Sequence, residues 1–375
     1  MNDADKPLPT AAARIAGKLR DARILAPGET RNLLVAVLIF VAAAGVPFVA
    51  NGYALTLAIS IAMYAGLSTS WLLFSGPTNY IALSTAAFFG IGMYTVAGGI
   101  GIVPYPVLIL AAAVAGAALA FVVGLATLRV SGVYFVIFTL GLAELVRQIM
   151  TWLQHVLGTM SGVYVLIDRS EPMYYWQLLL VAAAVYLVGW WIGRSRLGFA
   201  LRIIGNDEVV AVHCGINTAR AKVILFVISS TFAAITGALI APRWSYVEPG
   251  VAFSPALSFQ VVIMALLGGT QRLWGPLLGV IPFVLLWELI AIEVPSQTTL
   301  LLGVSFLLIV YVIPDGVTGL VENALHRRGA VAGSPLLKRS LAGSGSILRA
   351  SVRRSSDRVA GSVRDLMRRW KSYNA

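Results

Sequence analysis

The chain has 375 residues, of which 58% are hydrophobic and 12% are charged, and its mean hydropathy is +0.84. Because soluble domains carry about 25% charged residues, this composition excludes a soluble protein and predicts an all-α polytopic membrane protein. The single cysteine, Cys214, excludes an intramolecular disulfide and a cysteine-based metal cage.

Hydrophobic segments follow one another from residue 33 onward. A membrane-spanning helix needs about 20 predominantly apolar residues, and on that rule we expect about ten spans. They are 33–50, 53–75, 80–103, 104–128, 133–157, 173–193, 223–242, 258–269, 276–293 and 298–314. At about 1.5 Å per residue the segment 258–269 is too short to cross. It is therefore expected as a half-helix or a re-entrant segment packed inside the protein.

The net charge lies in the two ends of the chain. Residues 1–32 form a basic segment with six bases and four acids, and residues 323–375 hold twelve bases and two acids. Apolar residues recur at helical spacing among the arginines of this tail, which suits an amphipathic helix on membrane lipids. The Gly, Ser and Pro residues of 329–346 equally favour a disordered tail. No nucleic-acid-reading motif accompanies the bases, so we expect no nucleic-acid partner.

The positions of Lys and Arg predict the orientation, because these residues collect on the cytoplasmic side of a membrane. With ten spans, both termini and the loop 194–222 are expected in the cytoplasm. No small-residue cleavage site stands out before the first hydrophobic segment, so we expect a retained span rather than a signal peptide.

Residues for catalysis are scarce. The three histidines, His155, His213 and His326, lack the spacing of a zinc site or of a nucleophile with its base. The P-loop pattern G-x-x-x-x-G-K-[ST] is absent, so the chain cannot hydrolyse ATP by that route. We therefore expect a protein that is not an enzyme and binds no metal or cofactor of its own.

Ionisable residues inside spans are costly and are therefore functional candidates. Glu144 and Arg147 stand three residues apart on one face of the fifth predicted span, where they can pair. This pair suits recognition of a zwitterion, and it equally suits a self-neutralising contact that stabilises the bundle. Glu288 stands in the ninth predicted span and is a weaker candidate.

The long polar, basic stretch 194–222 interrupts the hydrophobic rhythm. Asn206, Asp207 and Glu208 place polar and acidic groups where a short helix would begin. Gly215 can close that helix in a left-handed conformation. The stretch predicts a helix of one to three turns lying across the membrane face, where a cytoplasmic partner can dock.

Several blocks of sequence resemble one family in the same order. They are Ser195-Arg-Leu-Gly-Phe-Ala-Leu-Arg-Ile-Ile-Gly-Asn-Asp-Glu with Ala211 and Gly215-Ile-Asn, Ala86-Ala-Phe-Phe-Gly-Ile-Gly-Met-Tyr-Thr, Ser131-Gly-Val-Tyr-Phe, Leu273-Trp-Gly-Pro-Leu-Leu-Gly and Ile313-Pro-Asp-Gly-Val-Thr-Gly-Leu. The chain thereby resembles branched-chain amino-acid ABC importer permeases of the LivM type. The resemblance covers about residues 33–322 and implies a transmembrane permease domain of the type II importer fold.

For the polar stretch, the resemblance implies a coupling loop whose short helix seats in a cleft of a separate ATPase subunit. The residues that it marks are Gly198, Arg202, Asn206, Asp207, Glu208, Ala211 and Gly215. ATP and Mg²⁺ would then be used by the partner. The alternative is an ordinary amphipathic loop between two helices.

One departure from the family concerns the connection between the second and third predicted spans. Where the family commonly has Ser-Leu-Gly followed by His or Gln, this chain has Ala82-Leu83-Ser84-Thr85. Ser84 and Thr85 are candidates for the transport pathway. Gly90 and Gly92 follow, and small residues at helical spacing favour close helix packing as the role of this block.

The resemblance also implies partners and a location. The partners are a paralogous LivH-type permease, two cytoplasmic ATPase subunits and a periplasmic substrate-binding protein, and the location is the bacterial inner membrane. Members of the family move branched-chain or other amino acids, urea and amides, or aromatic acids. An ion-driven secondary transporter is the alternative of another class, but no inverted repeat with midplane carboxylates is evident.

Overall fold

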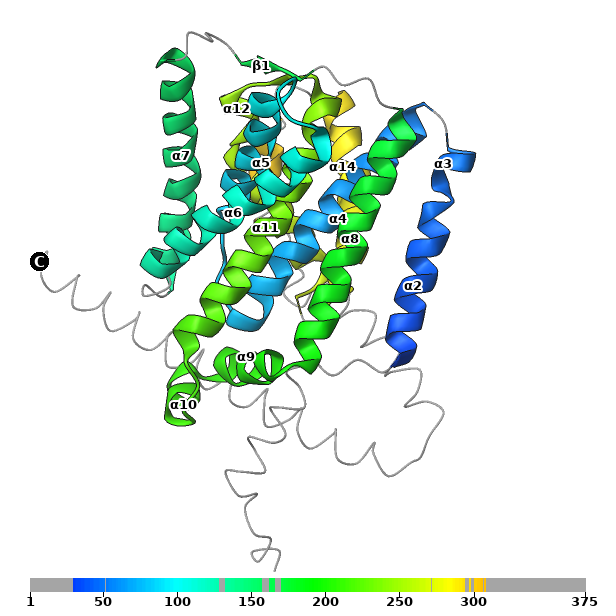
Figure 1. Ribbon diagram of the computed structural model, residues 1–375. Coiled ribbons are helices and arrows are strands. Elements are labelled where there is room, and N and C mark those ends of the chain that lie inside the picture. The colour runs from blue at the N-terminus through cyan, green and yellow to red at the C-terminus, as the bar shows by residue number, and fades with distance from the viewer. Residues whose placement is uncertain are drawn as a thin grey trace, which may run out of the picture. The chain divides into compact units, whose positions relative to one another are not determined.

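The computed structural model describes residues 30–50, 52–127, 132–156, 162–165, 170–270, 272–293, 297, 300–305 and 307. Its helices are α2 (Thr30–Ala44), α3 (Val46–Val49), α4 (Tyr53–Thr78), α5 (Thr85–Gly99), α6 (Tyr105–Thr127), α7 (Val133–Val156), α8 (Glu171–Arg194), α9 (Arg196–Asn206), α10 (Glu208–His213), α11 (Thr218–Trp244), α12 (Pro249–Ala252), α13 (Pro255–Gly268) and α14 (Gly275–Glu293). Two short strands, β1 (Val163–Tyr164) and β2 (Tyr246–Val247), pair antiparallel. The predicted all-helical architecture is confirmed (Figure 1).

Seven segments of the described chain are long and apolar enough to cross a membrane. They are α4, α6, α7, α8, α11, the α12–α13 segment Pro249–Gly268, and α14. A shorter apolar helix covers Ala36–Val49, within the first predicted span. The polytopic membrane class predicted from composition is therefore confirmed. Residues 1–29 of the predicted segment 1–32, the whole predicted segment 323–375, and most of the predicted span 298–314 lie outside the described residues.

Two predicted spans differ in the structure. The apolar run 80–103 forms a helix only over Thr85–Gly99. These 15 residues rise about 22 Å, which is too short for a crossing by α5 alone. The short segment predicted over 258–269 instead continues a helical stretch that begins at Pro249, and Pro249–Gly268 has the length of a full span.

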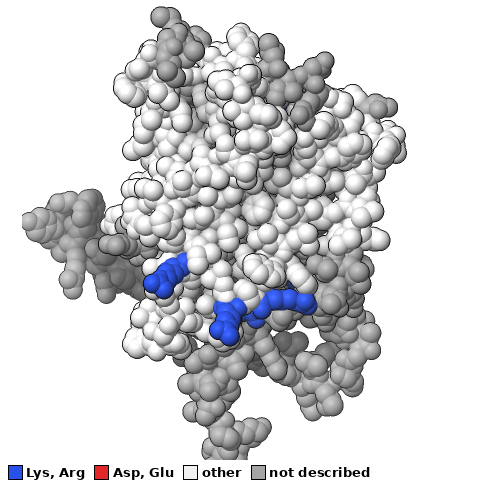
Figure 2. Space-filling view, in the orientation of Figure 1, with Lys and Arg blue, Asp and Glu red and all other residues white. Residues whose placement is uncertain are grey.

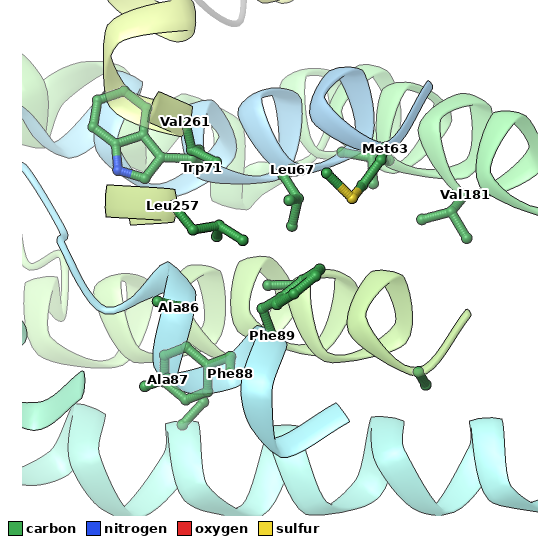
Figure 3. Packing of buried hydrophobic residues seen from close by; sticks show 14 of the residues in the cluster. Met63, Leu67, Trp71, Ala86, Ala87, Phe88, Phe89, Val181, Leu257 and Val261 are labelled. Atoms are coloured by element: carbon green, nitrogen blue, oxygen red, sulfur yellow. The ribbon is translucent and has the colours of Figure 1, made fainter. Parts of the chain in front are cut away.

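The core of the bundle is built around α4 and α11. Their apolar stretches are 72% and 61% buried, whereas those of α6, α7 and α14 are about a third buried or less. Figure 3 shows side chains of α4, α5, α8 and α13 converging in this core: Met63, Leu67, Trp71, Ala86, Ala87, Phe88, Phe89, Val181, Leu257 and Val261. The short helix α5 is thus enclosed by longer ones, which is where a helix too short to span is tolerated.

Glycines let α5 approach α11 closely. A Cβ atom on Gly92 would lie 1.9 Å from the carbonyl oxygen of Ala234, and one on Gly237 would lie 2.0 Å from that of Phe89. Backbone cannot move aside as the end of a flexible side chain can. The packing role predicted for Gly92 is therefore confirmed by these distances.

We expect Gly92→Ala to lower the free energy of unfolding by about 1–3 kcal/mol, which is the usual cost of an overpacked core position. Gly98→Ala on the same helix is the matched control, because nothing lies within 4 Å of the added Cβ there. Thermal unfolding of the purified protein in detergent measures both. Equal melting temperatures for the two variants would contradict the packing described here.

Candidate functional site

The polar stretch folds into two helices, α9 and α10, which lie across one end of the bundle (Figure 1). The backbone turns sharply from α8 into α9 at Ser195, whose Oγ accepts a hydrogen bond from the N–H of Gly198 (3.3 Å) and caps the new helix. A Cβ on Gly198 would lie 2.2 Å from the carbonyl oxygen of Ile192, so only glycine fits this approach. The Arg202 guanidinium donates to the Gly193 carbonyl (2.8 Å), and burial lowers the pKa of Arg202.

Helix α10 begins and ends with the capping residues that the sequence predicts. Asp207 is its N-cap, and its carboxylate accepts from the N–H groups of Val209 (2.8 Å) and Val210 (3.3 Å). Gly215 has a φ of +77° just after the helix, which is the conformation that favours glycine. Ala211 is fully buried against the bundle. The face of α10 that carries Ala211 is therefore packed against the bundle.

The opposite face of α10 is apolar and exposed. Val209 and Val212 are 65% and 56% exposed, and Val210, beside them, is also exposed. On the face shown in Figure 2, the visible Lys and Arg residues gather toward this same end of the bundle. Exposed valines within a charged, polar region are typical of a protein-binding surface rather than of a lipid-facing one. We call the exposed face formed by Val209, Val210, Val212 and His213 the α10 face.

Beneath the α10 face lies a buried ammonium group. Lys222, in the first turns of α11, has a side chain that is only 2% exposed. Its Nζ donates to Glu208 Oε1 (2.6 Å) and to the Tyr80 hydroxyl (3.0 Å), and it lies 4.3 Å from the centroid of the Tyr80 ring. The Tyr80 hydroxyl in turn donates to Glu208 Oε2 (3.3 Å). The first residue of α10 is thus joined to α11 and to the α4–α5 connection, and we call these three residues the Lys222 cluster.

The charges of this cluster are balanced. Burial raises the pKa of Glu208, but the hydrogen bond and the charge of Lys222 outweigh that effect, so the pKa lies below its ordinary value of 4.5. Glu208 is therefore ionised at neutral pH. Its partly exposed carboxylate is bonded to Lys222 and neutralises the buried ammonium.

A second contact ties the same two regions together. Asn79 ends α4 in the left-handed conformation, with a φ of 56°, and its Nδ2 donates to the carbonyl oxygen of Gly205 in α9 (2.9 Å). A Cβ on Gly205 would lie 2.4 Å from the Pro77 carbonyl oxygen, so α9 is packed directly on the end of α4. The end of α4 and the polar stretch therefore lie in direct contact at two places.

The connection from Asn79 to Ser84 is not helical, and its backbone is satisfied by side chains of other helices. Trp71 Nε1 donates to the Ala82 carbonyl (2.7 Å) and the N–H of Leu83 donates to Thr139 Oγ1 (3.0 Å). Just after the connection, in the first turn of α5, the N–H of Ala86 donates to Ser258 Oγ (2.9 Å). Helices α4, α7 and α13 thus supply one partner each. Non-helical backbone at membrane depth requires such partners.

Ser84 and Thr85, the predicted pathway residues, stand at this buried start of α5, where they are 2% and 7% exposed. Elsewhere in the core, the Tyr64 hydroxyl donates to Gln260 Oε1 (2.6 Å) between α4 and α13. The buried hydroxyls of Ser68 and Thr69 on α4 have no hydrogen-bond partner among the described residues. Polar side chains of α4, α5 and α13 are therefore buried inside the apolar core.

The other predicted intramembrane residues lie elsewhere. Glu144 and Arg147 pair with each other on α7, Arg147 Nε donating to Glu144 Oε2 (2.8 Å), and their side chains are 45% and 31% exposed. The pair therefore lies at the surface of this chain and not in the core beside Ser84. Glu288 on α14 lies close to Tyr53, the first residue of α4, which places it near the end of the bundle opposite α9 and α10.

The sequence reasoning missed two features of the site. The first is Lys222, which closes the predicted loop; a lysine followed at once by the apolar run Val-Ile-Leu-Phe is a signal that its charge is buried with a partner. The second is the outward orientation of Val209 and Val212. Their spacing of three residues places them on one helix face, opposite the buried Ala211.

Comparison with known proteins defines the class of this helical membrane protein. Residues 53–313 match the family model described as "Branched-chain amino acid transport system / permease component". The chain belongs to this family. It is a permease component, a transporter subunit and not an enzyme, which confirms the class predicted from sequence.

Two LivM relatives align with most of the chain, and a LivH relative aligns with about a third of it. The high-affinity branched-chain amino acid transport system permease protein LivM of Escherichia coli K12 is 26% identical over 340 residues, covering 80% of this chain and 78% of the relative. LivM of Salmonella typhimurium is 26% identical over 323 residues, covering 76% and 75%. The LivH permease of Escherichia coli K12 is 27% identical over 129 residues, covering 34% and 41%. The resemblance to the LivM type is confirmed.

Proposed function

We propose that this chain is the membrane subunit of an ATP-driven importer of branched-chain amino acids, driven by a separate ATPase that docks on the α10 face. The observation that carries the proposal is the exposed valine surface of a short helix lying across one end of an otherwise lipid-compatible bundle. A protein partner is needed to cover apolar side chains at a membrane–water boundary. In this role Gly198, Arg202, Ala211 and Gly215 shape the coupling helices, and Asn206 and Asp207 lie exposed at their junction.

The proposed topology has about ten crossings in the type II importer arrangement. The orientation is supported by the charges of the described residues. Arg194, Arg196, Arg202, Arg220 and Lys222 belong to the α9–α10 end, whereas at the opposite end Arg243 is paired with Glu171 (3.1 Å). By the rule that bases collect inside, α9 and α10 face the cytoplasm of a bacterial inner membrane. Figure 1 shows α2 beginning at this same end, which supports a cytoplasmic N-terminus.

The proposed assembly contains a LivH-type companion permease, two ATPases that use ATP and Mg²⁺, and a periplasmic substrate-binding protein. The likeness to both LivM and LivH supports the pairing of two related permeases. The α7 helix offers a surface for such a companion: its apolar stretch is 28% buried, and it carries the half-exposed Glu144–Arg147 pair.

The substrate is proposed from the two LivM relatives, whose names specify branched-chain amino acids. The test is uptake of labelled leucine into proteoliposomes that contain the permeases and ATPase, with loaded binding protein outside and ATP inside. We expect uptake that needs ATP, persists when ion gradients are collapsed, and is competed by isoleucine and valine.

Competition by urea or benzoate in place of valine would support the other substrates of this family. Uptake that needs an ion gradient and no ATP would contradict the proposal altogether. A matched preparation lacking only this chain is the control for uptake through the companion permease.

A further inference from the structure

The Lys222 cluster joins the α10 face to the start of α5, and this placement suggests a role in transport. Lys222 Nζ contacts Glu208 of α10 at 2.6 Å and Tyr80 of the α4–α5 connection at 3.0 Å. We propose that this cluster transmits displacement of α10 to the non-helical segment Asn79–Ser84, so that docking and pathway movements occur together. The inference rests on the proposed function, because it assumes that a partner moves α10.

The burial of the ammonium group gives the link its stiffness. With 2% of its side chain exposed, Lys222 cannot exchange its partners for water without leaving the protein interior. A movement that drew Glu208 away from Lys222 would leave a buried charge whose remaining hydrogen-bond partner among the described residues is the Tyr80 hydroxyl. The lower-energy movement keeps all three groups together, so a shift of α10 carries Tyr80 with it.

Tyr80 is placed to pass this movement on. Its ring packs edge-on against Phe135 at the start of α7, with the ring centroids 5.2 Å apart. Ser84 follows four residues later, and the backbone between them is held by hydrogen bonds to other helices rather than by a helical ladder. A segment held in this way can be displaced as a unit without unwinding a helix. The displacement would reach Ser84 and Thr85 within the buried polar groups of the core.

The Asn79–Gly205 hydrogen bond supports the same direction of movement. It connects the end of α4 to α9 beside the cluster, at 2.9 Å. The polar stretch is thereby tied to the Asn79–Ser84 segment by two contacts, one charged and one neutral. Weakening the charged contact alone should loosen the connection without detaching α9 from α4.

The experiment uses the complete reconstituted transporter and cysteine labelling of this chain. Cys214 is the only cysteine here, so Cys214→Ser gives a background for single probes at Val209 on the α10 face and at Ile81 in the Asn79–Ser84 segment. Both positions are exposed, at 65% and 41%. Maleimide labelling is measured without nucleotide and with ATP trapped by a hydrolysis inhibitor. With the cluster intact, we expect ATP to change the labelling rate at both positions by about fivefold or more.

Lys222→Met is expected to keep the response at position 209 and to abolish the response at position 81. Tyr80→Phe, which retains the ring but removes the hydroxyl, is the second test variant and should reduce the response at 81. Tyr175→Phe is the matched control, because it removes a hydrogen bond to Ala43 (2.7 Å) between α8 and the end of α2. In the Lys222→Met variant the amount of substrate imported per ATP hydrolysed should also fall, whereas general loss of structure would lower both activities equally.

Failure of this inference and failure of the docking proposal would give different labelling results. A full response at 81 in Lys222→Met and Tyr80→Phe, together with a response at 209, would overturn this inference and leave the docking proposal intact. The absence of any response at 209 in the intact transporter would overturn the docking proposal, and the inference with it.

Discussion

Replacing Val209 and Val212 together with glutamate is expected to detach the ATPase and reduce ATP-dependent uptake by more than about tenfold. A docked partner would cover both carboxylates without neutralising them, and burying an unpaired charge costs well over about 1.4 kcal/mol, which corresponds to a tenfold loss of affinity. The two valines lie three residues apart on the exposed face of α10, so both would be covered by a docked partner.

The measurement is co-purification of the ATPase with the permease from detergent-solubilised membranes. Glutamate is a good helix former and neither valine is buried, so α10 itself should stay folded. Val209→Leu with Val212→Leu is the matched control, since it keeps an apolar surface. Undiminished ATPase recovery with the two glutamates would show that the α10 face is not the docking surface.

The second large effect concerns stability: removing Glu208 should cost more than removing the charge of Lys222. Glu208→Ala should lower the free energy of unfolding by about 2–3 kcal/mol, because it leaves the ammonium of Lys222 buried without its carboxylate. This value is set below that of a fully buried pair because the Glu208 side chain is 41% exposed. Lys222→Met should cost less than about 1 kcal/mol, since an apolar chain of similar size replaces the charge and water can reach the remaining carboxylate.

Thermal unfolding of the two single variants and the double variant in detergent tests this asymmetry. The double variant should be close in stability to Lys222→Met, because Glu208→Ala costs little once the buried charge is gone. If Glu208→Ala were the milder substitution, the Lys222 ammonium would not depend on Glu208 for its stability.

Several features of the fold were predictable because their causes are local. Composition alone is sufficient for the polytopic membrane class, since about 20 apolar residues in succession have no other stable environment. The Asp207 cap and the positive φ of Gly215 were also predictable, because a helix of this kind needs an acceptor at its start and a permissive residue at its end.

The shortness of α5 was not predictable from hydropathy. The residues 79–84 are nearly as apolar as the helix that follows, and they stay non-helical because Trp71 of α4 and Thr139 of α7 supply hydrogen bonds to their backbone. A hydropathy window cannot detect such partners. It therefore merged the connection and the helix into one predicted span, 80–103.

The candidate site was predictable in position and less so in detail. The polar stretch 194–222 indicated where a partner docks, but Glu208 was expected to face that partner and instead bonds Lys222 in the interior. Glu144 and Arg147 pair as the sequence predicted, yet their half-exposed side chains lie at the surface of α7 and away from the polar groups of the core. Helical periodicity gives the face of a residue, whereas only packing shows what covers that face.

The most direct test of the central claim is photo-crosslinking from the α10 face in the working transporter. A benzophenone amino acid is placed at position 209, and the control places it at position 110 on α6, where Leu110 is 65% exposed within a membrane span. We predict a crosslink to the ATPase from position 209 and none from position 110. A transporter that imports its substrate with ATP, yet gives no ATPase crosslink from position 209, would contradict the claim.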